Sequence, residues 1–516
     1  MTGKKHHDEQ GVALVFTLFL MASLSALAVS LMFLAQTETA STRNYRTMSQ
    51  ARYAGEAGIH KAINYLVNTY PVPTDVPTGF DPTKSPVERN GAPVVLSAIS
   101  GVSSNYHDSA VVSAFNSAAQ GTLAVGTGTV NYSASATLVS IRQVTVYGGG
   151  SGLIQTWQLT AQGTVPGPMP ATVEVTAMLE RNFVQADTYA VFATGNGCGA
   201  ITLAGNVDTD SYDSTTMSTT PPATDASGGA VGTNGNLSIS GSVDVKGNLD
   251  TPRTGVGACN AGTPTALTGS GAAAVHGSVV QLPQAKIYPP PVITPVPPIG
   301  PQPITAAGCA AILAIPANSG ASCFGFGSNI TIVTAGTNTL LLGDVTLSAG
   351  TNLTIAYGSG GVPATGIANV NVNSITLTGN SSINIYAPTP TVPGSVMTSL
   401  VMGVAGKTAT GDLATPIDFA GGTIANATYD PSKFQILYAG SGTVKVTGGA
   451  AASATVYAPN ADIVKHGSGG FYGSILGRTF TDQAGSNSSV HYDRSLASKY
   501  FTLGNYVMTS FSWKKY

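Results

Sequence analysis

An uncharged apolar segment near the N-terminus constrains this chain more than any other feature. Gly11 to Ala35 is a run of 25 positions without a charged side chain. At 1.5 Å per residue, a helix of that length crosses the roughly 30 Å hydrocarbon core of a bilayer. Proline is then absent until Pro71, so the sequence predicts one helix over residues 11–70. Its first half would lie in lipid, and its second half needs a protein surface.

The flanking charges predict how this helix crosses the membrane. Lys4 and Lys5 precede the apolar segment, and no basic residue follows it before Arg43. The positive-inside rule therefore predicts a single pass with residues 1–10 as a cytoplasmic leader and the rest of the chain outside. A secretory signal peptide is the alternative, because Ala26-Leu27-Ala28 matches a cleavage pattern. The apolar run continues beyond that site, which favours an uncleaved anchor.

The composition predicts a β-rich envelope or extracellular protein of two or three domains. A chain of 516 residues is too long for one core, and its 43% hydrophobic content is enough to fill several. Charged residues make up 9% and the net charge is -2, which excludes the basic footprint of a nucleic-acid-binding protein. All six glutamates precede Arg181 whereas aspartate continues to Asp493. Because helices favour Glu and turns favour Asp, we expect a domain boundary near residues 181–187.

A small antiparallel β domain is expected over residues 71–182. Four segments alternate apolar and polar residues between Gly/Pro turns, as in a sheet with one buried face. The four segments are Val130–Ala136, Arg142–Tyr147, Leu153–Thr160 and Ala171–Ala177. Such a sheet would cover the outer half of the helix.

The N-terminal segment resembles PilX-type minor pilins. The residues that carry the resemblance are Gln10-Gly11-Val12-Ala13-Leu14-Val15 and, further along the same helix, Ser49-Gln50-Ala51-Arg52-Tyr53-Ala54-Gly55-Glu56-Ala57-Gly58-Ile59. The segment Ala161–Val175 is also similar to the end of PilX-type head domains. The resemblance covers mainly the first 70 residues.

This resemblance implies a type IV pilin-like protein and a set of partners. Prepilin peptidase would cut between Gly11 and Val12, and the helix would pack among other pilins and the pilus assembly machinery. Before assembly the protein would lie in the bacterial inner membrane with a periplasmic head, and after assembly at the cell surface. The chain departs from the major pilins at Phe16, where they carry a glutamate.

Small residues give the helix one smooth face. Ala54, Gly58 and Ala62 recur every four residues, and Ala51 with Gly55 forms a parallel row. Small side chains allow close backbone approach. Two interpretations stay open: the face packs on this protein's own sheet, or it contacts a neighbouring subunit.

Residues 183–516 are predicted to form a right-handed parallel β-helix, with a β-sandwich as the alternative. Short apolar runs recur between Gly/Asn turns about every 15 to 20 residues, which we interpret as one turn of a solenoid per run. The region resembles bactofilin-like β-helical domains through Tyr189–Ala193, Gly205–Asp208, Phe471–Ile475 and His491–Asp493. The predicted fold class is thus α+β: a pilin-like helix with a small sheet, then a large all-β solenoid.

Two further segments of this region have a predicted structure. Residues 283–303 are proline-rich and should be extended polyproline II, either as a stiff linker that splits the solenoid or as a strap lying over it. The aromatic tail, with Tyr500-Phe501, Tyr506, Phe511, Trp513 and Tyr516, is expected to cap an open solenoid end.

The sequence indicates neither an enzyme nor a cofactor. Paired carboxylates are needed for glycan hydrolysis, yet the solenoid region contains no glutamate and its aspartates mostly stand singly. Asp208, Asp210 and Asp213 form the densest acidic group, and we note them as a weak candidate Ca²⁺ site or a polar turn.

Four cysteines lie beyond the membrane segment, where disulfides form. Cys309 with Cys323 is the favoured pair, because it closes a short Gly/Ala-rich loop; free buried thiols are the alternative.

These features together predict a non-enzymatic minor pilin that displays a β-helical head for adhesion or partner contact, with an unknown surface ligand. A surface polysaccharide-active enzyme of solenoid fold and a permanently anchored envelope scaffold are the alternatives.

Overall fold

The computed structural model describes residues 9–73, 75–125, 128–147, 151–167, 170–269, 274–336, 338–386, 397–449, 451–482 and 487–515. The chain divides into two compact units. Unit 1 comprises residues 1–142, 153–181 and 506–516, and unit 2 comprises residues 143–152 and 182–505. The boundary between Arg181 and Asn182 coincides with the position after which the sequence contains no glutamate.

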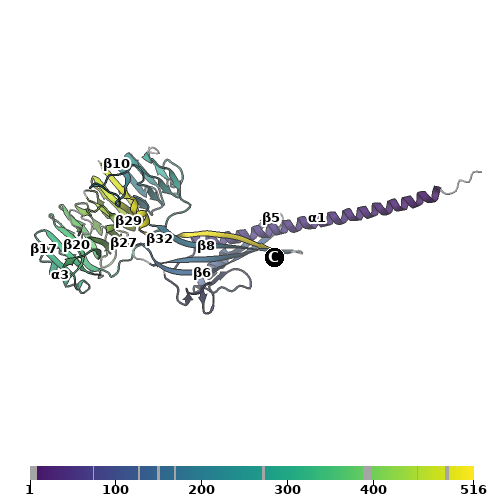
Figure 1. Ribbon diagram of the computed structural model, residues 1–516, viewed down its shortest axis with the longest axis horizontal. Helices are drawn as coiled ribbons and strands as arrows, with labels where there is room; N and C mark the ends of the chain where they lie inside the picture. Colours follow the sequence, from purple (N-terminus) through teal and green to yellow (C-terminus); the bar gives the residue numbers. More distant parts are fainter. Residues whose placement is uncertain are drawn as a thin grey trace, which may run out of the picture. The chain divides into compact units, whose positions relative to one another are not determined.

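Unit 1 is a long helix packed on an antiparallel sheet (Figure 1). The helix α1 spans Glu9–Asn68, and a shorter helix, α2, spans Ser109–Ala118. The strand order is β32-β8-β7-β6-β4, with β5 paired to β6. These strands are β4 (Val95–Ser97), β5 (Gln120–Val125), β6 (Gly128–Thr145), β7 (Ser151–Val165), β8 (Ala171–Gln185) and β32 (Phe501–Lys515), and a separate small sheet holds β1 (Phe80–Asp81), β2 (Glu88–Arg89) and β3 (Ala92–Pro93).

Two sequence predictions for this sheet were wrong in detail. The segments Val130–Ala136 and Arg142–Tyr147 were predicted as separate strands, but most of both lies in the single strand β6. The aromatic tail does not cap a solenoid, since β32 pairs with β8 and residues 506–516 belong to unit 1. Tyr516 lies outside the described residues.

A buried polar cluster holds the tail in place. The Tyr506 hydroxyl donates to Gln155 Oε1, which also accepts from Trp157 Nε1 at 3.2 Å. At the end of α1, the Tyr70 and Tyr106 hydroxyls lie 2.8 Å apart. Burial raises the pKa of Tyr106 to about 12, so these phenols stay neutral and keep their hydrogen bonds across the physiological pH range.

Unit 2 is a stack of short parallel strands with apolar side chains inside. Its strands are β9 (Val191–Ala193), β10 (Ile201–Tyr212), β11 (Val231–Thr233), β12 (Leu237–Val245), β13 (Leu249–Thr251), β14 (Leu267–Thr268), β15 (Val279–Gln281), β16 (Pro301–Gln302), β17 (Ser322–Phe326), β18 (Asn329–Ala335), β19 (Leu340–Leu347), β20 (Asn352–Ser359), β21 (Val362–Pro363), β22 (Gly366–Leu377), β23 (Ser381–Ile385), β24 (Thr398–Val404), β25 (Ile417–Asp418), β26 (Gly422–Ala425), β27 (Phe434–Tyr438), β28 (Val444–Thr447), β29 (Ser453–His466), β30 (Gly469–Asp482) and β31 (Ser488–Asp493). The short helices α3 (Cys309–Leu313), η2 (Pro316–Asn318), η3 (Pro431–Lys433) and η4 (Arg494–Ser498) lie in its connections.

In-register pairing of like residues builds this stack. Leu340 pairs with Val370, and Val370 with Met402, so an apolar side chain repeats at the same place in successive layers. The predicted period of about 15 to 20 residues holds in only part of the stack: Ser453 pairs with Tyr472, 19 positions on, whereas Leu340 pairs with Val370, 30 positions on. The described ladders are parallel apart from the short β17–β18 and β20–β21 hairpins, whereas a β-sandwich predicts antiparallel sheets.

The order of layers in space differs from their order in sequence. Strand β10 pairs with β12 on one side and with β30 and β31 on the other. One arm of the stack continues from β12 to β14, and the other runs from β30 through β29, β27, β24, β22 and β19 to β16. The first layer of the domain therefore lies inside the stack, between segments that are distant in sequence.

The proline-rich segment connects the two arms as a strap lying over the layers. It hydrogen bonds to successive layers: the Lys286 amide donates to Asn234 Oδ1 at 2.8 Å, Tyr457 donates to the Pro289 carbonyl, and Asn371 donates to the Pro295 carbonyl, both at 2.7 Å. The strap thus contacts β29 and β22 on its way to β16.

The helix α3 covers the interior at the β16 end of the stack. Ile312 of α3 is fully buried in the main core, and Asn318 of η2 bonds to the backbone N–H and C=O of Leu341. Asn318 thus satisfies backbone groups of β19, and α3 with η2, not the aromatic tail, covers this end of the stack.

A buried carboxyl lies beside the strap. Asp187 is 2% exposed, and its Oδ2 has no hydrogen-bond partner among the described residues. Burial raises the pKa of Asp187 to about 7. Burial, and after it the charge of Asp187, raises the pKa values of the surrounding hydroxyls of Tyr147, Tyr288, Tyr457, Tyr492 and Tyr500.

Asp187 should make unit 2 less stable as the pH rises. The folded state keeps a proton that the unfolded chain releases between about pH 4 and 7, so the free energy of unfolding falls across that window and stays low above it. The full loss is on the order of 4 kcal/mol. We expect Asp187→Asn to raise the free energy of unfolding at pH 8 and leave it nearly unchanged below pH 4, measured by chemical denaturation.

Asp225→Asn is the matched control, because Asp225 is exposed and its carboxylate pairs with Arg494 at 2.9 Å. That variant should gain no stability at pH 8. Equal pH dependence in Asp187→Asn and the parent chain would contradict the assignment.

Candidate functional site

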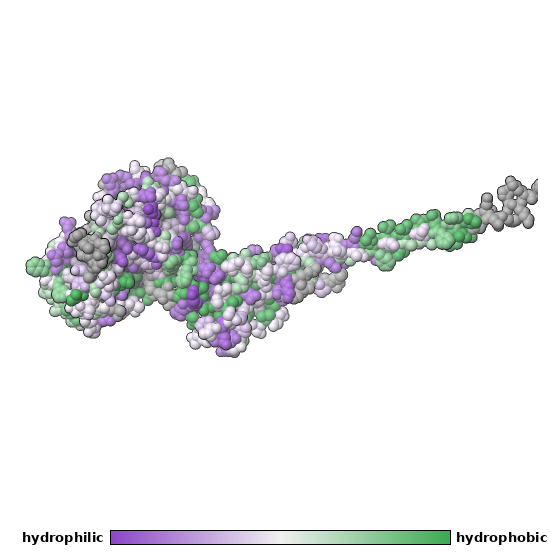
Figure 2. Space-filling model, in the orientation of Figure 1, coloured by the Kyte–Doolittle hydropathy of each residue, from purple (hydrophilic) through white to green (hydrophobic). Residues whose placement is uncertain are grey.

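The first half of α1 is not covered by any other described part of the chain. Every described side chain from Val12 to Arg46 is exposed, including Phe16, Phe19 and Phe33. Figure 2 shows this part of α1 as a projecting, mostly hydrophobic rod. Within the described residues, α1 is the one helix long and apolar enough to cross a membrane. Apolar surface of this extent needs lipid or protein around it.

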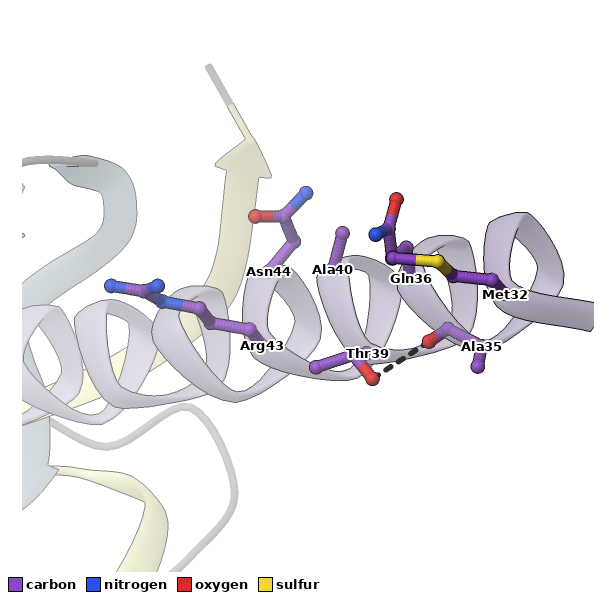
Figure 3. A pocket seen from close by; sticks show the side chains of 7 residues that line it. All are labelled: Met32, Ala35, Gln36, Thr39, Ala40, Arg43 and Asn44. Atoms are coloured by element: carbon purple, nitrogen blue, oxygen red, sulfur yellow. Dashed lines mark hydrogen bonds between the residues drawn. The ribbon is translucent and has the colours of Figure 1, made fainter. Parts of the chain in front are cut away.

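The helix surface changes from apolar to polar between Met32 and Asn44. Figure 3 shows a shallow depression there, lined by side chains of α1 alone, with Gln36, Thr39 and Arg43 following the apolar turns. The Thr39 hydroxyl donates to the Ala35 carbonyl at 2.7 Å, so it is satisfied within the helix. No second element among the described residues closes the depression, so it is not an enclosed ligand pocket.

The smooth face of α1 packs on the protein's own sheet. Ala51, Ala54 and Ala62 are fully buried, and Gly55 and Gly58 are buried beside them. A Cβ added at Gly55 would lie 2.7 Å from Val175 Cγ2, and one at Gly58 would lie 3.0 Å from Ala161 Cβ. Of the two interpretations of these residues, the structure therefore supports the intramolecular one.

A glycine on β7 makes this close approach possible. A Cβ added at Gly163 would lie 1.9 Å from the Ala51 carbonyl oxygen and 2.4 Å from the Gly55 nitrogen. The sequence analysis missed Gly163; the available indication was a glycine inside an otherwise alternating strand, which often marks close backbone approach.

A charged pair borders the packed face. Arg52 Nε lies 2.8 Å from Glu56 Oε1, and the Arg52 guanidinium lies 5.1 Å from the centre of the Trp513 ring. The pair is partly exposed and contributes at most about 1 kcal/mol. Its effect is to join the edge strand β32 to the helix.

Gly163→Ala should push α1 away from the sheet. The methyl group has no room against the helix backbone, so we expect a loss of about 3 kcal/mol in the free energy of unfolding. Gly128→Ala on β6 is the control, because its Cβ would lie 3.9 Å from the Val125 carbonyl oxygen, an ordinary van der Waals distance. Denaturant titration of the detergent-solubilised full chain measures both, and equal stability of the two variants would contradict the packing described here.

The structure does not bring Asp208, Asp210 and Asp213 together. Asp210 pairs with His491, whereas Asp213 accepts the Thr215 hydroxyl at 2.6 Å beyond the end of β10. That hydrogen bond lowers the pKa of Asp213, whereas burial raises the pKa of Asp208. Among the described residues, no group of three or more His, Cys, Asp or Glu side chains is arranged to hold a metal ion.

The other aspartates of this region are neutralised by bases. Asp208 lies beside Asp244 in the β10–β12 ladder, and Asp244 pairs with Lys246 and with His276. Asp208 and Asp244 are thus a like-charged cross-strand pair, unfavourable by itself, which the two bases paired with Asp244 offset. We therefore assign this cluster a structural role.

Residues around His491 join the first and last layers. Arg494 Nη1 lies 2.9 Å from Asp225 Oδ2, and Asp493 Oδ1 accepts the Ser214 amide at 3.1 Å. These contacts connect β31 to the segment after β10, which lies within the stack.

All four cysteines are paired. The structure joins Cys309 to Cys323, the pair that the short loop favours, and Cys198 to Cys259, which the sequence left open. Both disulfides lie in unit 2: Cys198 and Cys259 are on connections between strands, whereas Cys309 begins α3 and Cys323 lies on β17.

Comparison with known families places a pilin-like segment on α1. Residues 10–60 match the family model described as PilX N-terminal, and residues 341–499 match a domain of unknown function (DUF7305). The first match covers the exposed half of α1 and its small-residue face, and the second covers strands β19 to η4. The N-terminal segment is therefore type IV pilin-like, and neither match describes an enzyme.

Comparison with whole proteins adds little. No curated protein matches the chain. Among solved structures, the competence-associated pilin ComZ from Thermus thermophilus aligns over 91% of this chain and 98% of its own, with 13% identity and a TM-score of 0.27. A superposition this loose carries no argument about fold or function.

Proposed function

We propose that this protein is a non-enzymatic minor-pilin-like component of a type IV pilus-related system. The exposed half of α1 anchors it in the inner membrane before assembly and packs among the helices of other pilins afterwards. The N-terminus stays in the cytoplasm, and prepilin peptidase cuts between Gly11 and Val12.

The observation that carries this proposal is the incomplete cover of α1. One continuous helix has a half whose small-residue face its own sheet buries, at Ala51, Gly55 and Gly58, and a half that no other described part of the chain covers. A helix serving only as a domain core would be buried along its length, whereas a helix that packs among others needs this free apolar half.

Unit 2 is the part we propose to be displayed. Its parallel ladders, buried Val/Ile/Leu interior and covering helix α3 support a right-handed parallel β-helix, the usual hand of parallel crossovers. The pairing scheme also supports a likeness to bactofilin-like domains. We assign this head to adhesion or to partner contact outside the cell.

A permanently anchored envelope scaffold is a second candidate. Phe16, 71% exposed, stands where the major pilins carry a glutamate. A chain without that carboxylate can hold its place in the membrane without entering a fibre.

Photo-cross-linking from α1 tests the proposal. A benzophenone amino acid replaces Leu27, which is 60% exposed in the apolar half, or Val256, an exposed apolar residue of unit 2 that serves as the matched control. In cells that produce fibres, we expect the probe at position 27, but not at position 256, to form adducts with other pilin-like proteins that appear in sheared fibres. Adducts confined to membrane fractions, whether with proteins or with lipid, would contradict the pilin proposal and favour the scaffold.

A further inference from the structure

One end of the parallel stack carries an uncharged face with exposed aromatic rings. It is the outer face of the sheet β17-β18-β20-β23-β26. Figure 1 shows β17, β20 and α3 together at this end of unit 2. The inward residues of these strands, such as Ile330, Leu353 and Ile383, are buried in the core, so the alternate residues point outward.

The outward residues form two rows across the strands, each beginning with an exposed phenylalanine. Pairing in register gives the first row, Phe326, Asn329, Asn352 and Ser382. The second row is Phe324, Thr331, Thr354 and Asn384. Neighbouring members of a row are about 4.8 Å apart, the spacing of adjacent strands.

Hydrogen bonds hold the polar groups of this face in place. Asn352 Nδ2 donates to Asn329 Oδ1 at 3.0 Å, and the Ser382 hydroxyl donates to Asn352 Oδ1 at 2.6 Å. Asn384 Nδ2 donates to the Ser382 oxygen at 3.0 Å. The amides and hydroxyls are thereby ordered before a ligand arrives, which lowers the entropic cost of binding.

The strand that carries the two phenylalanines is fixed by a disulfide, and the Phe324 ring also packs on a glycine. Phe326 is 87% exposed and Phe324 is 51% exposed, so neither ring serves the core. The preceding residue, Cys323, is bonded to Cys309 of α3. The Phe324 ring lies against Gly361, where a Cβ would come within 2.7 Å of its Cζ and the backbone φ of +81° itself favours glycine.

The charge distribution defines the chemistry of a partner. Between Lys286 and Lys407 the sequence contains a single charged residue, Asp344. Its carboxylate is engaged by Ser374 and Asn373, at 2.7 and 2.6 Å, on β22 and away from the two rows. An anionic polymer or an acidic lipid surface requires cations, which this face lacks.

We propose that this face binds a neutral polysaccharide. Aromatic rings pack against the C–H faces of sugar rings, and ordered rows of amides and hydroxyls exchange hydrogen bonds with sugar hydroxyls. Exposed apolar groups fixed on a rigid scaffold mark interaction sites on soluble surfaces. The inference deepens the proposed adhesive role of unit 2 and rests on it only for the display of this face outside the cell.

Binding of the full-length chain in nanodiscs to insoluble glycans tests the proposal. The probes are microcrystalline cellulose and chitin as neutral polysaccharides, with polygalacturonate as an anionic polysaccharide and phosphatidylcholine vesicles as a lipid surface. We expect retention on at least one neutral glycan and none on polygalacturonate. The double variant Phe324→Ser/Phe326→Ser should bind at least tenfold more weakly, and Asn352→Asp should also weaken binding by placing a charge within the first row.

Val279→Ser is the matched control, because Val279 is an exposed apolar residue on β15, in the other arm of the stack. It should bind as the parent chain does, and an unchanged thermal midpoint in every variant shows that the fold is intact. Binding to neither glycan, undiminished binding by the double variant, or binding to vesicles instead would overturn the proposal. Cross-linking from Leu27 does not depend on this face, so failure here is distinguishable from failure of the pilin role.

Discussion

The close contact between α1 and strand β7 determines which part of the helix is available to other molecules. Backbone meets backbone at Ala51, Gly55 and Gly163, and no larger side chain fits at either glycine. From this contact onward one face of the helix is buried by its own sheet, and before it no other described residue covers the helix. Uncovered apolar surface is costly in water, so the first half of α1 requires lipid, other helices or both. The proposed membrane and fibre roles of α1 both follow from that requirement.

The parallel stack follows a different constraint. Strand β10 has neighbours from segments that lie both after it and near the end of the chain, so the stack is complete only when β30 and β31 are in place. Contacts between residues so far apart in sequence form slowly, because the chain loses the entropy of closing a long loop before strand pairing contributes favourable free energy. The strap makes this arrangement of strands possible, because it carries the chain along the outside of the stack from β15 to β16. Two of its carbonyl groups accept hydrogen bonds from the side chains of Tyr457 and Asn371.

Sequence reasoning succeeded where the information is local. The length of α1, its free apolar half and its smooth face follow from composition and spacing within one helix, and the resemblance to PilX-type pilins rests on the same residues. The alternating runs indicated strands correctly. These runs do not indicate which strand pairs with which. The alternation in β32 would be the same in a solenoid cap and in the sheet of β8, so its position depends on contacts that are distant in sequence. Asp210 and His491 likewise meet across a separation that no local pattern records.

The central claim is that α1 is a processed pilin helix, and the N-terminal mass of the native protein tests it most directly. The protein is taken from sheared surface fibres and, separately, from the inner membrane. The account predicts a terminus at Val12 in the fibre fraction, despite Phe16. An intact Met1 found in membranes alone would contradict it and would leave α1 as a permanent anchor.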